Sequence, residues 1–368
     1  MLDNDRLHLA YLLQAGYTHH DLKNIFSSWD ISSAEKLWSD TLIWSVDTDI
    51  TPERQEKIYT KARVVEIEKI RKLLVEKSVE IVTLYDGKYP ERLKTIGHAP
   101  FFLYVRGDLR DELPPLIWVV GSRKHTPYAK RILEKILPDL IQAGVWIISG
   151  GAIWVDSMGH EITLAHSGYT IAVFGTGIDR CYPAGNKKLF ESILEKWWAL
   201  ISHFPLGIWP EIYNFPVRNE LVAAISSGIL IPEAGLSSGT LITAQLALEH
   251  GRDVFAVPGD IDRATSEGTN MLISSGQAKC VRCSEDILEE YFDVKGMKEG
   301  MTPVVKVPPV FTNALEKKVY EAIESGMNQV DDISRMSDLP MTDTLMTLTM
   351  LEIGGHISMD EMGRYRSV

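Results

Sequence analysis

The 368-residue sequence is poor in cysteine: it holds three, an odd number and too few for a disulfide framework. It also lacks an apolar run long enough to cross a membrane, and it has no signal-peptide pattern near its start. These absences exclude the disulfide-rich secreted class and the membrane class. We therefore expect a cytoplasmic protein without a membrane partner.

The sequence also lacks the common motifs for nucleotides and metals. No loop ends in the Gly-Lys-Ser/Thr of a Walker A motif, and no G-x-G-x-x-G follows a buried strand. Asp156 and His160 have the helical spacing of two metal ligands without a third, which favours a hydrogen-bonded structural pair. Cys280 and Cys283 have zinc or redox spacing without a second pair. We expect no cofactor, no metal and no catalytic residue.

Positive charge is scarce as well, since the formal net charge is −12. This balance argues against a broad surface that coats nucleic acid. A local groove remains compatible with it, because charge contacts act over a Debye length of ~8 Å. Residues 121–131 hold four cationic residues and no acidic one. A polyanion should therefore bind at this segment first.

The pattern of apolar residues predicts three structural parts. Residues 1–78 have helical periodicity and should form a small helical accessory domain. Short apolar runs then occur at residues 80–84, 102–105, 116–120, 145–149, 170–174, 199–202, 228–232, 253–257 and 278–281. Helical patterns lie at residues 126–143, 156–166, 187–196, 219–225, 238–249 and 284–291. This alternation predicts an α/β domain over residues 79–292, a Rossmann-like doubly wound, mostly parallel sheet with its ligand site at the carboxyl ends of the strands.

The third part follows a linker. Residues 293–310 carry glycines and prolines without periodicity. Residues 311–368 show helical patterns at 313–324, 330–335 and 341–353, then short strands at 356–359 and 364–367, which together predict a winged helix.

The third helix of this predicted winged helix is unsuited to DNA. It contains none of the Arg, Lys, Asn or Gln residues that contact base edges, and residues 301–368 carry six Lys or Arg against ten Asp or Glu. Its apolar residues should build the core of the module and leave some side chains for a protein contact: Leu345, Met346, Leu348, Met350 and Leu351.

A first candidate site follows the apolar run 116–120, where the chain continues as Gly121, Ser122, Arg123 and Lys124. Glycine permits a tight turn, the next helix points free N–H groups at it, and a guanidinium fits phosphate oxygens. This arrangement predicts an anion site. The alternative is an ordinary strand-to-helix turn whose Arg123 makes a surface ion pair.

A second candidate is the segment 214–219. Pro216 favours an extended residue before it, and Asn219 is a suitable helix N-cap. Phe215 and Arg218 would then lie at a loop tip beside the crevice, where they suit stacking on a base and holding its phosphate. The alternative is that Phe215 packs beneath the loop and Arg218 bonds to backbone carbonyls.

A third candidate is the Gly/Ser-rich turn before the helix predicted at 238–249. Ser238, Gly239 and Thr240 would offer hydroxyls and free N–H groups at a helix start, which is the composition of an anion-binding nest.

An ordered set of short motifs over residues 80–290 resembles the DprA/Smf family, the bacterial DNA-processing proteins of natural transformation. The shared segments include Tyr85-Asp86, Tyr89-Pro90, Val120-Gly121-Ser122-Arg123, Ser149-Gly150, Tyr182-Pro183, Phe215-Pro216, Arg218-Asn219, Ser238-Gly239-Thr240-Leu241-Ile242-Thr243-Ala244, Val257-Pro258-Gly259 and Gly268-Thr269-Asn270.

This resemblance implies a non-catalytic protein that binds single-stranded DNA in the pocket of its Rossmann-like domain. It further implies a homodimer formed through that domain, a SAM-like N-terminal domain, protection of incoming strands and loading of the RecA recombinase. Matches to the family's pocket positions are Gly121, Ser122, Arg123, Phe215, Arg218, Asn219, Ser238 and Gly239.

The sequence departs from the family at several basic positions. Ile153-Trp154-Val155 stands where the family has an arginine-containing segment. Ala184 replaces the usual basic residue, although Lys187 lies close by, and Val217 and Glu220 also replace residues that are commonly basic. Each loss removes a potential phosphate contact. We therefore expect weaker or differently tuned strand binding.

An alternative from another class is a nucleotide-processing enzyme of the lysine-decarboxylase-like phosphoribohydrolase type. Those enzymes carry Pro-Gly-Gly-x-Gly-Thr before a catalytic glutamate. Here Pro232-Glu233-Ala234-Gly235 lacks the paired glycines, and residues 243–248 contain no acid before Glu249.

Overall fold

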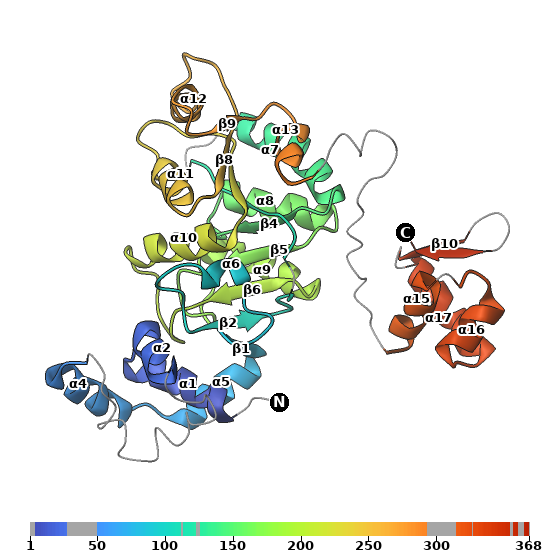
Figure 1. The fold of residues 1–368 in the computed structure, drawn as a ribbon, viewed down its shortest axis with the longest axis horizontal. Coiled ribbons are helices and arrows are strands. Elements are labelled where there is room, and N and C mark those ends of the chain that lie inside the picture. Colours follow the sequence, from blue (N-terminus) through green and yellow to red (C-terminus); the bar gives the residue numbers. More distant parts are fainter. Residues whose placement is uncertain are drawn as a thin grey trace. The chain divides into compact units, whose positions relative to one another are not determined.

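The computed structural model describes residues 4–27, 50–111, 113–122, 126–292, 314–325, 327–353, 356–359 and 364–367. The chain divides into two compact units, Met1–Val305 and Lys306–Val368 (Figure 1). The linker predicted at residues 293–310 lies outside the described residues.

The first unit begins with helices, as the periodicity of residues 1–78 predicted. They are α1 (Asn4–Ala15), α2 (His19–Ser27), α4 (Pro52–Ala62) and α5 (Ile67–Glu76). Leu7, Leu12 and Leu74 are buried in a core that also includes residues of the sheet. A boundary between these helices and the sheet stays a prediction, because this core is continuous across it.

The sheet of the first unit is nine-stranded over the described residues, in the order β1-β2-β6-β5-β4-β3-β7-β8-β9. The strands are β1 (Val79–Thr83), β2 (Phe102–Arg106), β3 (Leu116–Val119), β4 (Trp146–Ser149), β5 (Thr170–Val173), β6 (Ala199–Ser202), β7 (Gly228–Ile231), β8 (Asp253–Ala256) and β9 (Lys279–Cys280). β3 to β9 are parallel, whereas β2 is antiparallel to both β1 and β6. The predicted mostly parallel α/β sheet is confirmed.

Helices cover both faces of this sheet (Figure 1). They are α6 (Glu91–Lys94), α7 (Pro127–Gln142), α8 (Val155–Ala165), η3 (Ala184–Asn186), α9 (Lys187–Glu195), α10 (Asn214–Ile225), α11 (Gly239–Glu249), α12 (Glu267–Ser274) and α13 (Glu285–Tyr291). Alternate β3 residues serve opposite faces: Ile117 and Val119 pack with α7 and α13, whereas Trp118 packs in the core that includes α10 and α11. Fully buried parallel strands of this kind need apolar residues on both sides.

The strand order sets the place of the ligand crevice. From β3 the chain winds through α7, β4 and β5 to β6 on one side, and it then returns to β7 on the other side of β3. The chain thus reverses its winding direction between β3 and β7, and ligands of open α/β sheets bind at the carboxyl ends of the strands at such a point. We call this place at the ends of β3 and β7 the crevice.

The second unit has the predicted three helices and a hairpin. These are α15 (Ala314–Glu324), α16 (Val330–Ser337) and α17 (Met341–Ile353), followed by the antiparallel pair β10 (Ile357–Met359) and β11 (Tyr365–Ser367). Leu348 and Leu351 of α17 lie in its core, whereas Leu345, Met346 and Met350 are exposed. The expectation that these five residues mainly build the core is therefore met only by Leu348 and Leu351, and the other three are left on the surface. Within the described parts of the chain, every helix is too short or too polar to span a membrane.

Candidate nucleic-acid interface

The turn after β3 forms one wall of the crevice. A Cβ atom added at Gly121 would lie 2.8 Å from Cγ2 of Val155, so only glycine allows α8 to start this close to the turn. The Ser122 N–H donates to the carbonyl of Glu233 at 3.1 Å, which ties this turn to the loop after β7. Arg123 and Lys124 lie outside the described residues, so their predicted phosphate contacts stay predictions.

The carboxylate of Glu233 lies at the N-terminus of α7. This buried carboxylate accepts hydrogen bonds from the N–H and the Oγ1 of Thr126, both at 2.8 Å, and from Oγ1 of Thr265 at 2.8 Å. Thr126 in turn caps α7 by accepting from the Tyr128 N–H at 3.2 Å. A protein carboxylate thus occupies part of the helix N-terminus that we had predicted to face an external anion.

The turn before α11 ends in a helix start within a residue of the predicted position, because α11 begins at Gly239 with Ser238 as its N-cap. Oγ of Ser238 accepts from the Thr240 N–H at 3.2 Å and donates to Oγ1 of Thr240 at 2.9 Å. Thr240 is buried, whereas Gly239 is exposed and no atom lies within 4 Å of a Cβ built on it. The start of α11 is therefore open at Gly239, and the anion contacts predicted for Ser238, Gly239 and Thr240 stay predictions.

The loop-tip location predicted for Phe215 and Arg218 is wrong, because α10 already begins at Asn214 rather than after Asn219. Pro216 is the third residue of this helix. Proline is tolerated there, since the first-turn N–H groups have no partner within the helix. Phe215 and Arg218 consequently project from a rigid first turn.

Arg218 has the contacts of the alternative interpretation. Only 6% of its surface is exposed. Its Nη1 donates to the carbonyls of Gly150 and Val173, the latter at 2.6 Å, and its Nε donates to Oδ1 of Asn219 at 3.0 Å. A Cβ at Gly150 would lie 2.4 Å from the guanidinium carbon. Arg218 thus joins α10 to the ends of β4 and β5, and the DNA contacts predicted for Arg218 and Asn219 stay predictions.

Asp156 and His160 have separate structural partners. Asp156 accepts from the Ala152 N–H at 3.2 Å, and Nδ1 of His160 lies 2.7 Å from Oγ1 of Thr170. Burial raises the pKa of Asp156, and the positive charge of Arg218 opposes that rise. The described residues contain no group of three His, Cys, Asp or Glu that could hold a metal ion.

Aromatic side chains form the rim beside α10. Phe215 is half-buried, and a Cβ at Gly175 would lie 3.2 Å from its ring. The Tyr182 ring centroid lies 5.8 Å from that of Phe215, and Tyr182 is 45% exposed. Trp154 is 47% exposed and has a φ of +92°, a strained value for a residue with a side chain. In the sequence, Trp154 stands out only because it lies in a segment where the family has an arginine. Tyr182 stands out only as part of the Tyr182-Pro183 motif.

Lys187 supplies an exposed cation on the same rim. It starts α9 with a side chain that is 70% exposed and an Nζ 3.8 Å from Oε1 of Glu191. The preceding residue, Asn186, donates from Nδ2 to the carbonyl of Gly151 at 3.0 Å. Lys187 is therefore held next to the loop after β4.

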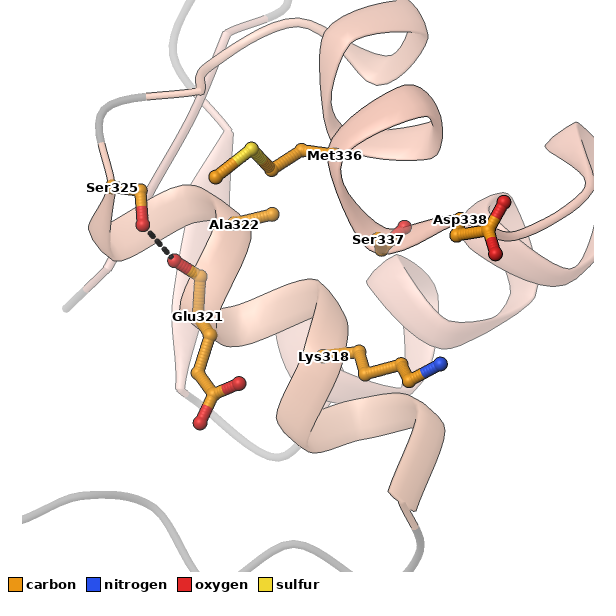
Figure 2. A pocket seen from close by; sticks show the side chains of 7 residues that line it. All are labelled: Lys318, Glu321, Ala322, Ser325, Met336, Ser337 and Asp338. Carbon is orange, nitrogen blue, oxygen red and sulfur yellow. Dashed lines mark hydrogen bonds between the residues drawn. The ribbon is translucent and has the colours of Figure 1, made fainter.

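The second unit contains a separate groove of about 660 Å³ between α15 and α16 (Figure 2). Its lining comprises Lys318, Glu321, Ala322, Ser325, Met336, Ser337 and Asp338. One lysine stands against two carboxylates, and Met336 is exposed. Such a lining does not favour a polyanion.

Fold and site together define a Rossmann-like α/β protein with a ligand crevice at its switch point, joined in the chain to a winged helix. The family model for DNA recombination-mediator protein A matches residues 80–292, and that for the DprA winged helix domain matches residues 306–359. The chain belongs to this family, the DprA/Smf family.

Relatives support the assignment along most of the chain. Protein Smf of Escherichia coli is 35% identical over 272 residues, which cover 73% of this chain and 72% of that protein. DNA processing protein DprA of Streptococcus pneumoniae is 39% identical over 209 residues, covering 57% of this chain and 73% of the relative.

Two solved structures are similar. The X-ray structure of DprA from Streptococcus pneumoniae has a TM-score of 0.67 and 29% identity, and the match covers 79% of this chain and 99% of that one. A structure of DprA from Helicobacter pylori, described for its single-stranded DNA binding mode, has a TM-score of 0.52 and 29% identity, covering 58% and 98% of the two chains.

Proposed function

We propose that this protein is a non-catalytic single-stranded DNA-binding protein of recombination. The observation that carries the proposal is the aromatic rim, where the half-exposed ring of Phe215 lies beside Tyr182, together with the open start of α11 at Gly239. Aromatic faces stack on unpaired bases of any sequence, and a helix N-terminus favours phosphate. The Helicobacter pylori relative, described as binding single-stranded DNA, supports the same conclusion.

The site favours binding over hydrolysis. The carboxylate of Glu233 is buried and already bonded to Thr126 and Thr265. Helix α11 carries one acid, Glu249, which is its last residue and accepts from Gln245 at 3.1 Å. The end of α11 at the crevice thus lacks the glutamate that the phosphoribohydrolase alternative requires.

Within this function, we further propose a homodimer formed through the Rossmann-like domain, acting in the cytoplasm. It would protect incoming strands during natural transformation and load RecA onto them, as the family resemblance implies. Neither role needs a catalytic group, a metal or a cofactor.

The direct test compares the affinities of the protein for a labelled single strand and for the matching duplex, by fluorescence anisotropy at one salt concentration. We expect clear preference for the single strand, because the bases of a duplex are not free to stack on protein side chains. A parallel assay for hydrolysis of nucleoside monophosphates should show no activity. Turnover without strand preference would favour the enzyme instead.

Replacing Phe215 by alanine should reduce single-strand affinity by ~1–3 kcal/mol, because one stacked base is lost. The salt dependence of binding should stay nearly intact, since stacking releases no counterions. Ile212→Ala is the matched control: Ile212 is 90% exposed just before α10 but has no aromatic face. A changed salt slope with an unchanged affinity would contradict the stacking role of Phe215.

Removing residues 307–368 should leave single-strand affinity essentially unchanged. The winged helix carries more acidic than basic residues, and α17 exposes Leu345, Met346 and Met350 rather than cations. We therefore expect its removal to affect only self-association or partner binding. The measurement is a titration of the full-length and shortened proteins at the same salt concentration. A loss of about tenfold or more would show that the module contacts DNA.

A further inference from the structure

Trp209 lies on the surface of the loop that joins β6 to α10, and 64% of it is exposed. An exposed indole offers a face on which an unpaired base can stack, and tryptophan is enriched at interfaces. Trp209 was not among the candidate residues of the sequence, because it belongs to no motif there.

The backbone of this loop is fixed. The Gly177 N–H donates to the carbonyl of Ile208 at 3.0 Å, and the Gly207 N–H donates to Oδ1 of Asp179 at 2.8 Å. Nδ2 of Asn214, a buried residue, donates to the carbonyl of Trp209 at 3.3 Å. The indole therefore projects from a braced position, so that little conformational entropy would be lost when a ligand stacks on it.

The guanidinium of Arg180 packs against the indole of Trp209. Its guanidinium carbon lies 4.6 Å from the centre of the Trp209 ring, and its Nε lies 3.3 Å from Oδ2 of Asp179. The Arg180 side chain is itself 40% exposed. The guanidinium therefore lies over one face of the indole, while most of the Trp209 side chain stays exposed. An indole and a guanidinium are the two kinds of group that bind a nucleobase and its phosphate.

This pair adjoins the aromatic rim of the crevice. Arg180 belongs to the loop after β5, which also carries Gly175, where the Phe215 ring packs, and Tyr182. Asn214, which bonds to the Trp209 carbonyl, directly precedes Phe215. The carboxyl ends of β5 and β6, which are parallel neighbours, thus bring both groups to the same edge.

We propose that Trp209 and Arg180 form a second stacking site for an unpaired nucleobase, continuous with the crevice on its β6 side. The inference rests on the proposed single-strand binding and extends the path of the strand beyond Phe215. This second site would also compensate for three basic residues of the family that are replaced in this chain, by Trp154, Ala184 and Val217. Part of the binding free energy for the strand would then come from base stacking instead of from charge contacts with phosphates.

The test is a length series of labelled oligothymidylates, from about four to about sixteen nucleotides, titrated with wild-type protein and with Trp209→Ala. The longer strands should bind the variant about 5- to 100-fold more weakly, while the shortest, which fills only the crevice, should bind both proteins equally. Arg180→Ala should also lower the salt slope on long strands by about 0.7, the share of one phosphate contact.

Trp197→Ala is the matched control. Trp197 is 62% exposed, but it precedes β6 and therefore lies at the opposite end of that strand. This variant should bind strands of every length as the wild type does. Far-ultraviolet circular dichroism and urea unfolding check that both tryptophan variants are folded.

Three other outcomes would overturn the proposal, and each points to a different cause. If Phe215→Ala weakens binding and Trp209→Ala does not, the second site is wrong and the proposed function stands. If the wild type shows no preference for single strands, the proposed function itself fails. If Trp209→Ala changes only self-association in sedimentation, the indole serves a contact between proteins.

Discussion

Replacing Arg218 by alanine is expected to lower the free energy of unfolding by about 3–5 kcal/mol, the cost of breaking a buried charged network at one partner. The carbonyls of Gly150 and Val173 would lose their donor in an enclosed site, and buried acceptors without partners are costly. The neighbouring Asp156 carboxylate would lose the positive charge that stabilises its ionised form. Urea unfolding followed by circular dichroism measures the change.

Two further variants separate anchoring from DNA contact. Lys187→Ala removes a cation that is 70% exposed, so it should change stability by less than about 0.5 kcal/mol. On the proposed function it should instead reduce the salt slope of single-strand binding by about 0.7. Gly150→Ala should destabilise as Arg218→Ala does, because its Cβ would displace the guanidinium. Stability of Arg218→Ala within about 1 kcal/mol of the wild type would refute the anchoring role.

Acidification from about pH 7 to about pH 5 should reduce the free energy of unfolding by about 4 kcal/mol through two buried histidines. Burial lowers the pKa of His160 and of His203 to about 3, helped by the charge of Arg218, and for His203 by that of His19 as well. In the unfolded chain both return to the ordinary value of 6.5, so the unfolded state binds the protons. The contribution of these two histidines to the free energy of unfolding is therefore complete above the unfolded pKa. It is lost progressively as the pH falls below about 6.5. His19, whose pKa burial lowers to about 4, acts in the same direction.

His160→Gln isolates one of these contributions. The variant should lose about 2 kcal/mol less than the wild type between about pH 7 and about pH 5, as measured by urea unfolding at each pH. His166→Gln, an exposed position at the other end of α8, should keep the wild-type pH dependence. Asp156 works against the histidines, because burial raises its pKa and acid then favours its folded, protonated form. Equal pH dependence in wild type and His160→Gln would show that His160 does not contribute.

The sequence determined the architecture because buried parallel strands and amphipathic helices leave patterns along a continuous stretch of chain. All nine predicted strands are present within a residue or two, and so are the three helices and the hairpin of the second unit. The antiparallel edge formed by β1 and β2 has no comparable signal, since strand direction depends on how the chain returns in space. α10 begins earlier than the sequence predicts, because the first turn of a helix accepts a proline such as Pro216.

The candidate site was only partly determined by the sequence. Gly121, Ser122, Ser238 and Gly239 could be predicted at the crevice, because turn chemistry and helix starts are local properties. The partners of Arg218 depended on tertiary structure, because its carbonyl acceptors at Gly150 and Val173 lie on other strands. The same holds for Arg180 and Trp209, which are 29 positions apart and meet only because β5 and β6 are parallel neighbours. Local sequence sets which groups a strand end can carry, whereas the packing of the sheet decides which of those groups stand together and which remain exposed.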